Sequence, residues 1–302
     1  MSWTWGAVTS FPALPGARGP AVVAGQRELT RRLSRAGAHL VLVESPAAGP
    51  SFETAVLPAH LAGPVPGAAV LPGGRVADAP PYLLARQVVA SDHLTHGRTG
   101  WWCQDAGDDP ARAAEYLGVL AALWDSWEPD ALVMDRASGA YADHRKVHPV
   151  EHRGRHYRVR GPLNTLPSPQ GRPVLAVSAT GTAAVEVAAG HADLLVVGGP
   201  VDDAADAVAR LRAGLAAAGR PLDACRALLR RPARTPADEL TEAVTRCGAD
   251  GFLLELPAGD TPALDRDLTA VTADLVPDLT RAGVLAPPAP RATLRTRLQE
   301  TT

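Results

Sequence analysis

Four histidines, His144, His148, His152 and His156, recur every four residues in the middle of the chain. On a continuous helix this spacing would place the imidazoles on one face, and imidazole is a common metal ligand. Pro149 lies inside the run and interrupts a helix because it lacks an amide hydrogen. We therefore predict no metal site. Two alternatives stay open: His148 and His152 are catalytic groups beside a substrate, or they are solvated residues of a hairpin.

Two carboxylates are further candidates for acid–base chemistry. Glu44 ends one apolar run, and Asp105 follows closely after another. A carboxylate at the end of a buried strand is costly to hold unless it takes part in chemistry or pairs with a cation. We therefore expect Glu44 to act as an acid or base, or to bind an arginine, and the sequence does not choose between these roles.

Cys103, Arg75 and Arg158 are the candidate substrate contacts. Cys103 ends a strand-like run, but no histidine or lysine near it in sequence would activate its thiol, so simple packing is the alternative. Arg75 follows a pair of glycines, which predict a turn that is mobile or has a positive φ. The alternative for Arg75 is an exposed salt bridge with Asp78. Arg158 lies in a short strand predicted over 156–160.

Short apolar runs alternate with amphipathic stretches along the chain. The runs 39–43, 193–197 and 251–255 are apolar almost throughout, which is typical of parallel strands buried on both faces. A strand–helix alternation repeated about eight times predicts an α/β fold, a TIM-type (β/α)8 barrel. A doubly wound open sheet is the alternative. The expected strands cover 5–10, 39–44, 67–71, 99–103, 174–178, 193–197, 225–229 and 251–255, and the expected helices cover 21–35, 81–94, 111–127, 202–218, 236–247 and 262–282.

The stretch 134–173 breaks this rhythm between the fourth helix and the fifth strand, because it carries few periodic apolar residues. It predicts a hairpin excursion over the carboxyl-terminal mouth of the barrel, where barrel enzymes place their chemistry. In the C-terminal tail, 284–302, prolines at 287–290 predict a stiff spacer before a short helix at 292–299. We expect residues 1–302 to form a single domain.

The composition narrows the classes of function. The chain has 302 residues, 46% of them hydrophobic, and a formal charge of −2, so there is no basic surplus for nucleic acid. The N-terminus lacks a signal-peptide pattern, and no apolar stretch reaches the roughly 18 residues of a membrane span. Three widely spaced cysteines form neither a disulfide framework nor a zinc motif. These features predict a cytoplasmic protein that acts on a small molecule.

Three motifs carry a family resemblance: LWDSW at 123–127, KVH at 146–148 and GPLNTLPSPQGRP at 161–173. With them, the chain resembles the branch of the bacterial-luciferase-like flavin monooxygenases that contains the nitrilotriacetate, dibenzothiophene-sulfone and streptogramin-type enzymes. The resemblance implies a barrel that binds reduced FMN delivered by a separate flavin reductase. It also implies activation of oxygen and a homodimer.

The chain departs from that family where the relatives hold the flavin. Trp102 stands where the family pattern has an asparagine, so an amide is replaced by a bulky indole with one donor. After the fifth strand the family has a glycine- and serine-containing turn, whose amides bind the phosphate at a helix N-terminus. Here Ser178, Thr180, Gly181 and Thr182 are the groups left to contact FMN. We therefore predict that FMN is bound weakly or not at all.

Three hypotheses follow from these features. The chain is a monooxygenase with an altered, weak FMN site, or a flavin-free enzyme that uses the inherited barrel for acid–base chemistry. In the third hypothesis it is a non-catalytic subunit that pairs with a longer homologue. The resemblance favours the first hypothesis, which is the function we expect, and the lost flavin contacts favour the second.

Overall fold

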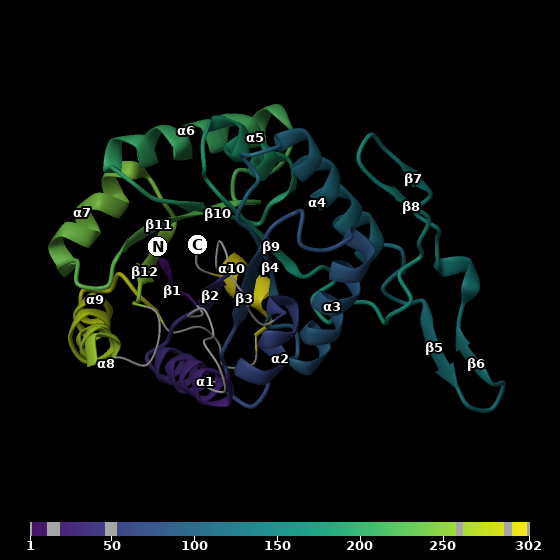
Figure 1. Ribbon diagram of the computed structural model, residues 1–302, viewed down its shortest axis with the longest axis horizontal. Coiled ribbons are helices and arrows are strands. Elements are labelled where there is room, and N and C mark those ends of the chain that lie inside the picture. Colours follow the sequence, from purple (N-terminus) through teal and green to yellow (C-terminus); the bar gives the residue numbers. More distant parts are fainter. Residues whose placement is uncertain (1, 11–18, 46–52, 258–261, 287–291, 301–302) are drawn as a thin grey trace.

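Eight parallel strands close into a barrel, which confirms the predicted (β/α)8 fold (Figure 1). The computed structural model describes residues 2–10, 19–45, 53–257, 262–286 and 292–300, so the predicted spacer at 287–290 lies outside the described residues. The barrel strands are β1 (Thr4–Ser10), β2 (Leu40–Glu44), β3 (Val70–Gly74), β4 (Gly100–Cys103), β9 (Val174–Ser178), β10 (Leu194–Val197), β11 (Arg226–Pro232) and β12 (Gly251–Glu255). Their order around the barrel follows the chain, and β1 closes the ring by pairing with both β2 and β12.

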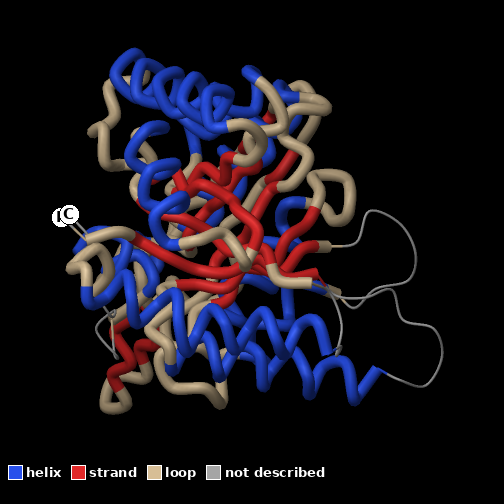
Figure 2. The backbone as a smooth tube through the Cα atoms, turned by 90° about the vertical axis from the view of Figure 1, so that its left-hand side faces the viewer, coloured by secondary structure: helices blue, strands red, loops and turns tan. Residues whose placement is uncertain are grey.

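Helices surround the strands as an outer layer (Figure 2). Each predicted helix is present within three residues of its predicted bounds, because apolar periodicity marks the buried face of a helix. Among the described helices, none is long and apolar enough to cross a membrane. The helices are α1 (Gly19–Arg35), η1 (Thr54–Val56), α2 (Leu57–Leu61), α3 (Pro81–Leu94), α4 (Pro110–Trp124), α5 (Thr182–His191), α6 (Val201–Ala217), α7 (Ala237–Cys247), α8 (Pro262–Thr269), η3 (Ala270–Leu275, a π-helix), α9 (Val276–Arg281) and α10 (Leu294–Glu300). The predicted range 262–282 is divided among α8, η3 and α9, and η1, α2 and α5 were not predicted.

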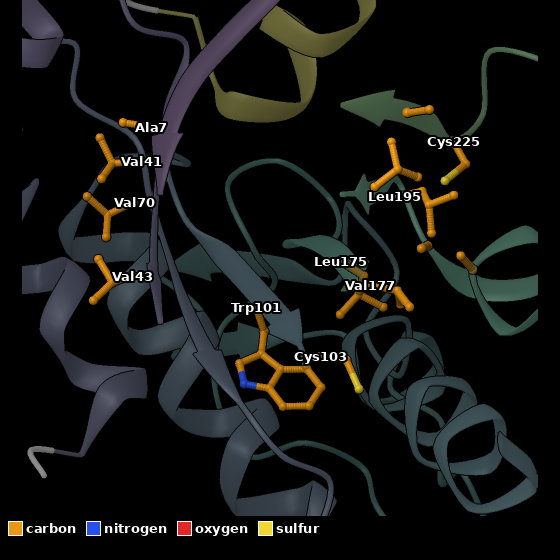
Figure 3. Close-up of a cluster of buried hydrophobic side chains, with 14 of the residues drawn as sticks. Ala7, Val41, Val43, Val70, Trp101, Cys103, Leu175, Val177, Leu195 and Cys225 are labelled. Atoms are coloured by element: carbon orange, nitrogen blue, oxygen red, sulfur yellow. The ribbon is translucent and has the colours of Figure 1, made fainter. Parts of the chain in front are cut away.

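The side chains of each strand alternate between two apolar layers. Trp102 belongs to the cluster that fills the barrel interior, whereas Trp101 and Cys103 belong to the layer between strands and helices. In the outer layer, Trp101 and Cys103 lie near Leu175 and Val177 (Figure 3). Both faces of a barrel strand are therefore apolar, which explains the continuous apolar runs in the sequence.

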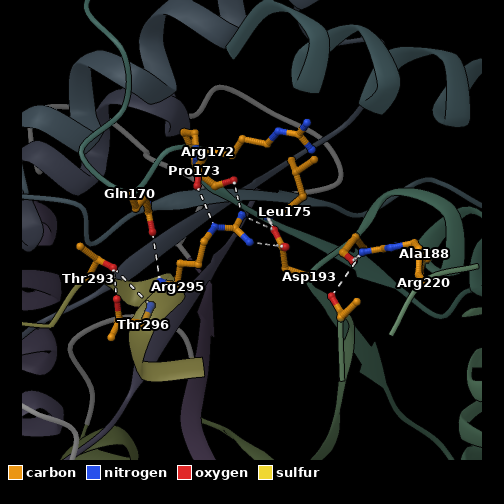
Figure 4. A network of polar contacts seen from close by, with 12 residues as sticks. Gln170, Arg172, Pro173, Leu175, Ala188, Asp193, Arg220, Thr293, Arg295 and Thr296 are labelled. Atoms are coloured by element: carbon orange, nitrogen blue, oxygen red, sulfur yellow. Dashed lines mark hydrogen bonds and ion pairs between the residues drawn. The ribbon is translucent and has the colours of Figure 1, made fainter. Parts of the chain in front are cut away.

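The short helix α10 covers the amino-terminal end of the barrel. Leu294 and Leu298 join the interior cluster. Arg295 forms a bidentate ion pair with Asp193, in which Nη1 and Nη2 lie 2.7 and 2.9 Å from the two carboxylate oxygens (Figure 4). The backbone amide of Arg295 also donates to the side-chain oxygen of Gln170 at 3.1 Å. These contacts hold the C-terminal helix against the ends of β9 and β10, so this end of the barrel is closed by structure rather than open to substrate.

The third strand differs from the prediction, because β3 begins at Val70 instead of residue 67. Gly67 has a φ of +80° and ends the preceding turn. The glycine pair Gly73 and Gly74 lies at the end of the strand, not in a mobile turn. A Cβ on Gly73 would lie 2.4 Å from the Gln104 side-chain oxygen and 3.0 Å from the Val43 carbonyl oxygen, so a larger residue here would displace the Gln104 side chain.

The predicted excursion between the fourth and fifth barrel strands is present, but its placement corrects the prediction. It contains two small antiparallel pairs that lie beside α3 and α4, on the outside of the helical layer (Figure 1). The second pair packs on the first half of α4 through polar contacts to that helix. The excursion therefore does not lie across the barrel mouth. Its elements are β5 (Leu132–Asp135), β6 (Ala140–Ala142), η2 (His144–Lys146), β7 (His152–Arg153) and β8 (Arg158–Val159).

Candidate functional site

A pocket of about 360 Å³ lies at the carboxyl-terminal mouth of the barrel. It is formed over the ends of β1, β2, β11 and β12, where enzymes with this architecture bind their substrates. Val8, Pro232 and Leu256 give it apolar walls. Its polar groups come from Ser10, Glu44, Arg230, Arg234, Glu255 and Asp267. We refer to this space as the mouth pocket.

Arg230 is the centre of the mouth pocket. Its Nη1 donates to Glu44 Oε1 at 2.6 Å, and its Nε contacts Glu255. Ser10 Oγ donates to the other oxygen of Glu44 at 2.6 Å. The side chains of Glu44 and Arg230 are 23% and 28% exposed, so water only partly screens the pair. Of the two roles expected for Glu44, the structure provides the arginine partner, and the two carboxylates leave the cluster with a net negative charge.

Trp102 fills the side of the barrel interior that is lined by β3, β4 and β9. The residue is 1% exposed and packs in the interior cluster with Leu71 and Ala176. Its only donor, Nε1, bonds to Ser178 Oγ at 2.9 Å. Two residues predicted to bind the cofactor are thus brought together, but they bind each other. The indole is part of the packed barrel interior on this side, and the mouth pocket lies over the opposite strands, β1, β2, β11 and β12.

The turn before α5 keeps part of an anion-binding arrangement. Thr180, Gly181 and Thr182 are exposed, and α5 begins at Thr182 with Gly181 at a φ of +129°. Within the described part of the chain, no side chain caps this helix, so its first amides stay available to an anion. A Cβ on Gly107 would lie 2.5 Å from Thr180 Oγ1, so the loop after β4 lies against one of the two hydroxyls.

Cys103 and Asp105 stabilise the loops beside the mouth. Cys103 is fully buried in the outer layer, and burial raises the pKa of its thiol far above the ordinary value. Its side chain faces the helices, as the packing alternative expects, and a contact between Cys103 and substrate stays a prediction. Asp105 accepts the Val76 amide at 3.1 Å and the Cys103 thiol at 3.5 Å. It joins the loop after β3 to the loop after β4.

The two predicted substrate arginines lie apart from each other. Arg75 is exposed on the loop after β3, and its amide donates to Asp78 Oδ2 at 2.8 Å. Arg158 is exposed on β8, in the excursion outside α4. The contact to Asp78 therefore forms through the backbone rather than as the expected salt bridge, and the structure does not bring these two guanidinium groups into one site.

The hairpin histidines bind carboxylates outside the barrel. His148 Nε2 lies 2.7 Å from Glu128 Oε1, and His152 Nε2 lies 2.9 Å from Glu115 Oε1. Glu115 also accepts the amides of His156 and Tyr157, at 2.9 and 2.8 Å. These contacts hold β7 and β8 on α4. Among the residues that the structure describes, no group of three or more histidines, cysteines or carboxylates could hold a metal.

Burial raises the pKa of Glu115, but its hydrogen bonds from His152 and the two hairpin amides outweigh that effect and lower the pKa to about 2. Glu115 was not predicted, because it lies in the middle of α4 and its partners follow about forty residues later. The sequence analysis did not predict Arg230 either. Its position directly after the apolar run 225–229, at the same edge of the barrel as Glu44, could have indicated that the two side chains pair.

The comparisons with known proteins agree with this architecture. The family model of luciferase-like monooxygenases matches residues 6–247. One subunit of pristinamycin IIA synthase, from Streptomyces pristinaespiralis, is 39% identical over 261 residues, which cover 84% of this chain and 88% of that protein. The other named subunit of the same synthase is 32% identical over 147 residues, covering 43% of this chain and 30% of its own length.

Two further comparisons place the chain among its relatives. Dibenzothiophene-sulfone monooxygenase of Rhodococcus erythropolis is 40% identical over 113 residues, covering 32% of this chain and 25% of that enzyme. The crystal structure of the long-chain alkane monooxygenase LadA superposes with a TM-score of 0.85 at 18% identity, covering 99% of this chain and 96% of LadA, and so shows the shared fold. The chain belongs to the family of luciferase-like monooxygenases.

Proposed function

We propose that this chain is the smaller subunit of a two-subunit luciferase-like monooxygenase that acts on a small organic molecule. In this proposal the longer partner, a member of the same family, binds reduced FMN supplied by a separate flavin reductase. The observation that carries the proposal is the position of Trp102, which is buried in the barrel and bonded to Ser178. Because the resemblance puts a flavin contact at this position, the proposal takes the indole to leave the flavin ring no room there.

The residues at this mouth do not fit FMN bound as the resemblance implies. The turn at Thr180–Thr182 offers amides and hydroxyls to a phosphate, but the barrel beside it is filled by the indole. A flavin ring in that half would have to displace Trp102, which costs both apolar burial and the bond to Ser178. A phosphate group alone would bind weakly at an exposed turn.

The comparisons support a subunit role. The relative that is 39% identical over most of this chain is named as one subunit of pristinamycin IIA synthase, and the second named subunit of that synthase is also a relative. If this chain assembles as the subunits of that synthase are named to do, it pairs with a longer chain of its own family. The mouth pocket gives less support to a flavin-free acid–base enzyme, since Arg230 and Ser10 already occupy both oxygens of Glu44.

A flavin titration tests the proposal. The purified chain, a longer luciferase-like chain of the same organism and an equimolar mixture are each titrated with FMN, and flavin fluorescence is recorded. We expect the chain alone to leave the fluorescence unchanged, and the longer chain and the mixture to quench it. Activity with a reductase is expected only from the mixture. Stoichiometric quenching by the chain alone would show that it holds its own flavin, as in the first of the three hypotheses.

A further inference from the structure

The pair β5–β6 forms a projecting arm, residues 132–142, that extends sideways beyond α3 (Figure 1). A two-stranded hairpin has little stability of its own and usually needs another surface to cover it. The arm nevertheless exposes three large apolar side chains. Val133 is 49% exposed, Met134 is 57% exposed and Tyr141 is 56% exposed. Gathered on one short hairpin, they are more than the isolated apolar residues expected on a monomer.

The backbone of the arm presents these side chains together. Leu132 pairs with Ala142 and Asp135 pairs with Ala140, so two residues on one strand face one residue on the other. This β-bulge places Val133 and Met134 opposite Tyr141. Met134 has a φ of +50°, in the left-handed region that glycine adopts freely and that side chains other than asparagine and aspartate rarely adopt. Strained residues concentrate at functional sites, and an exposed methionine on a bulge is a feature of binding surfaces.

A groove of about 800 Å³ begins at the base of the arm. Its walls carry apolar rings from Trp124, Trp127, Pro129, Pro167 and Pro169, and Leu132 of the arm closes one side. The Asp125–Arg172 ion pair lies at its edge. Leu132 belongs to both the groove and the arm, and we call the two together the arm–groove surface.

We propose that the arm–groove surface docks the longer luciferase-like partner, an inference that rests on the proposed function. Three apolar side chains cannot supply the roughly 800 Å² that each partner buries in a stable complex, so the groove must take part. The groove walls come from the motifs at 123–127 and 161–173, which carry the family resemblance. A partner from the same family would bring these motifs too, which allows an approximately two-fold, reciprocal contact.

The occupant is the longer chain rather than a second copy, because the relatives are the two named subunits of one synthase. The arm carries one exposed acidic residue, Asp135, and one exposed basic residue, Arg136, so its charges balance, while its three large exposed side chains are apolar. Apolar contact with little charge is typical of stable subunit interfaces. The charged residues that line the groove are already paired within the chain: Asp125 with Arg172, Glu128 with His148, and Arg295 with Asp193.

The test measures association of purified full-length chains by sedimentation velocity. The probe is the longer luciferase-like chain of the same organism, mixed with the wild-type chain, with a double variant Met134→Ser/Tyr141→Ser or with Leu222→Ser. Leu222 is equally exposed, at 56%, and lies between α6 and β11, away from the arm. We expect a 1:1 complex for the wild type and for Leu222→Ser, and at least a roughly tenfold weaker Kd for the double variant.

The outcomes separate the two proposals. If the double variant binds the longer chain as tightly as the wild type, the arm–groove surface is not the interface, although the subunit role stands. If the wild type binds no longer family member, the subunit role fails and the docking proposal fails with it. If the wild type pairs with itself and the double variant is monomeric, the occupant is a second copy, and the proposed partner is wrong. Circular dichroism checks that each variant is folded.

Discussion

The indole Nε1 of Trp102 donates a hydrogen bond of 2.9 Å to the Oγ of Ser178 on the neighbouring barrel strand. The two residues lie on the adjacent strands β4 and β9, and Ser178 is two residues beyond Ala176, the register partner of Trp102. Both belong to positions where the resemblance places flavin contacts. The indole on β4 thus fills part of the interior and occupies the hydroxyl on the next strand.

This pairing predicts coupled losses of stability. Ser178→Ala leaves the buried indole N–H without its acceptor and should lower the free energy of unfolding by about 1–3 kcal/mol. Trp102→Phe keeps most of the ring in place and removes the donor, so a loss of roughly 1–2 kcal/mol is expected. The double variant should lose less than the sum. Urea unfolding of all four proteins gives the coupling energy, and strict additivity would show that the bond contributes nothing.

Arg230 should be the most sensitive polar residue of the mouth pocket. Arg230→Met leaves Glu44 and Glu255 close together without a cation, and this like-charge repulsion should lower stability by about 1–3 kcal/mol at neutral pH. Part of the repulsion is screened because the side chains are partly exposed. Urea unfolding at pH 7 with and without added salt measures it, because salt screens like-charge repulsion and should reduce the loss. Arg234→Met, at an exposed pair with Asp267, serves as the control. An equal loss in both variants would contradict the special role of Arg230.

Much of the fold could be predicted from the sequence because its signals are local. The apolar runs of β9 and β12 and the helices α3 and α7 follow from periodicity within a few residues of the chain. The orientation of Trp102 could not be predicted. Trp101 and Trp102 are neighbours on a strand with two apolar faces, so no polar side marks which indole points inward.

The candidate site was less predictable because its contacts connect distant parts of the chain. Glu44 and Arg230 are 186 residues apart, and only closure of the barrel brings β2 and β11 to the same mouth. Glu115 meets its partners through the excursion, whose position beside α4 depends on packing rather than on local pattern. The residue types identified candidate site residues, but which residues pair with Glu44 and Glu115 became visible only in the folded structure.

Acid should release the β7–β8 hairpin from α4. The pKa of Glu115 in the folded protein is about 2, below the ordinary 4.5, so its contacts stabilise the folded state fully above about pH 4.5. That stabilisation is lost as the pH falls from 4.5 toward 2. Hydrogen exchange at the amides of His156 and Tyr157 should accelerate in this range, after correction for intrinsic rates. Glu115→Gln should show fast exchange already at pH 6, whereas Glu128→Gln, beside the exposed His148, should not. Protection of both amides in Glu115→Gln would contradict this role.

Asp92 should give the opposite pH dependence in the range between pH 4 and pH 6. Burial raises the pKa of this carboxyl to about 6, although Ser168, the Thr99 amide and Gln170 all donate to it. The folded state therefore binds the proton more tightly than the unfolded state does. Stability is greatest below the unfolded pKa near 4 and falls as the pH rises to 6, by on the order of 3 kcal/mol.

The matched variant for this carboxyl is Asp92→Asn, which keeps the shape and a carbonyl oxygen for Gln170 but cannot ionise. The free energy of unfolding of the wild type, measured in urea from pH 4 to pH 7, should decrease relative to that of Asp92→Asn and then run parallel to it above pH 6. Other groups titrate equally in both proteins, so the difference isolates this carboxyl. Parallel curves over the whole range would mean that Asp92 is ionised throughout and that its three donors outweigh its burial.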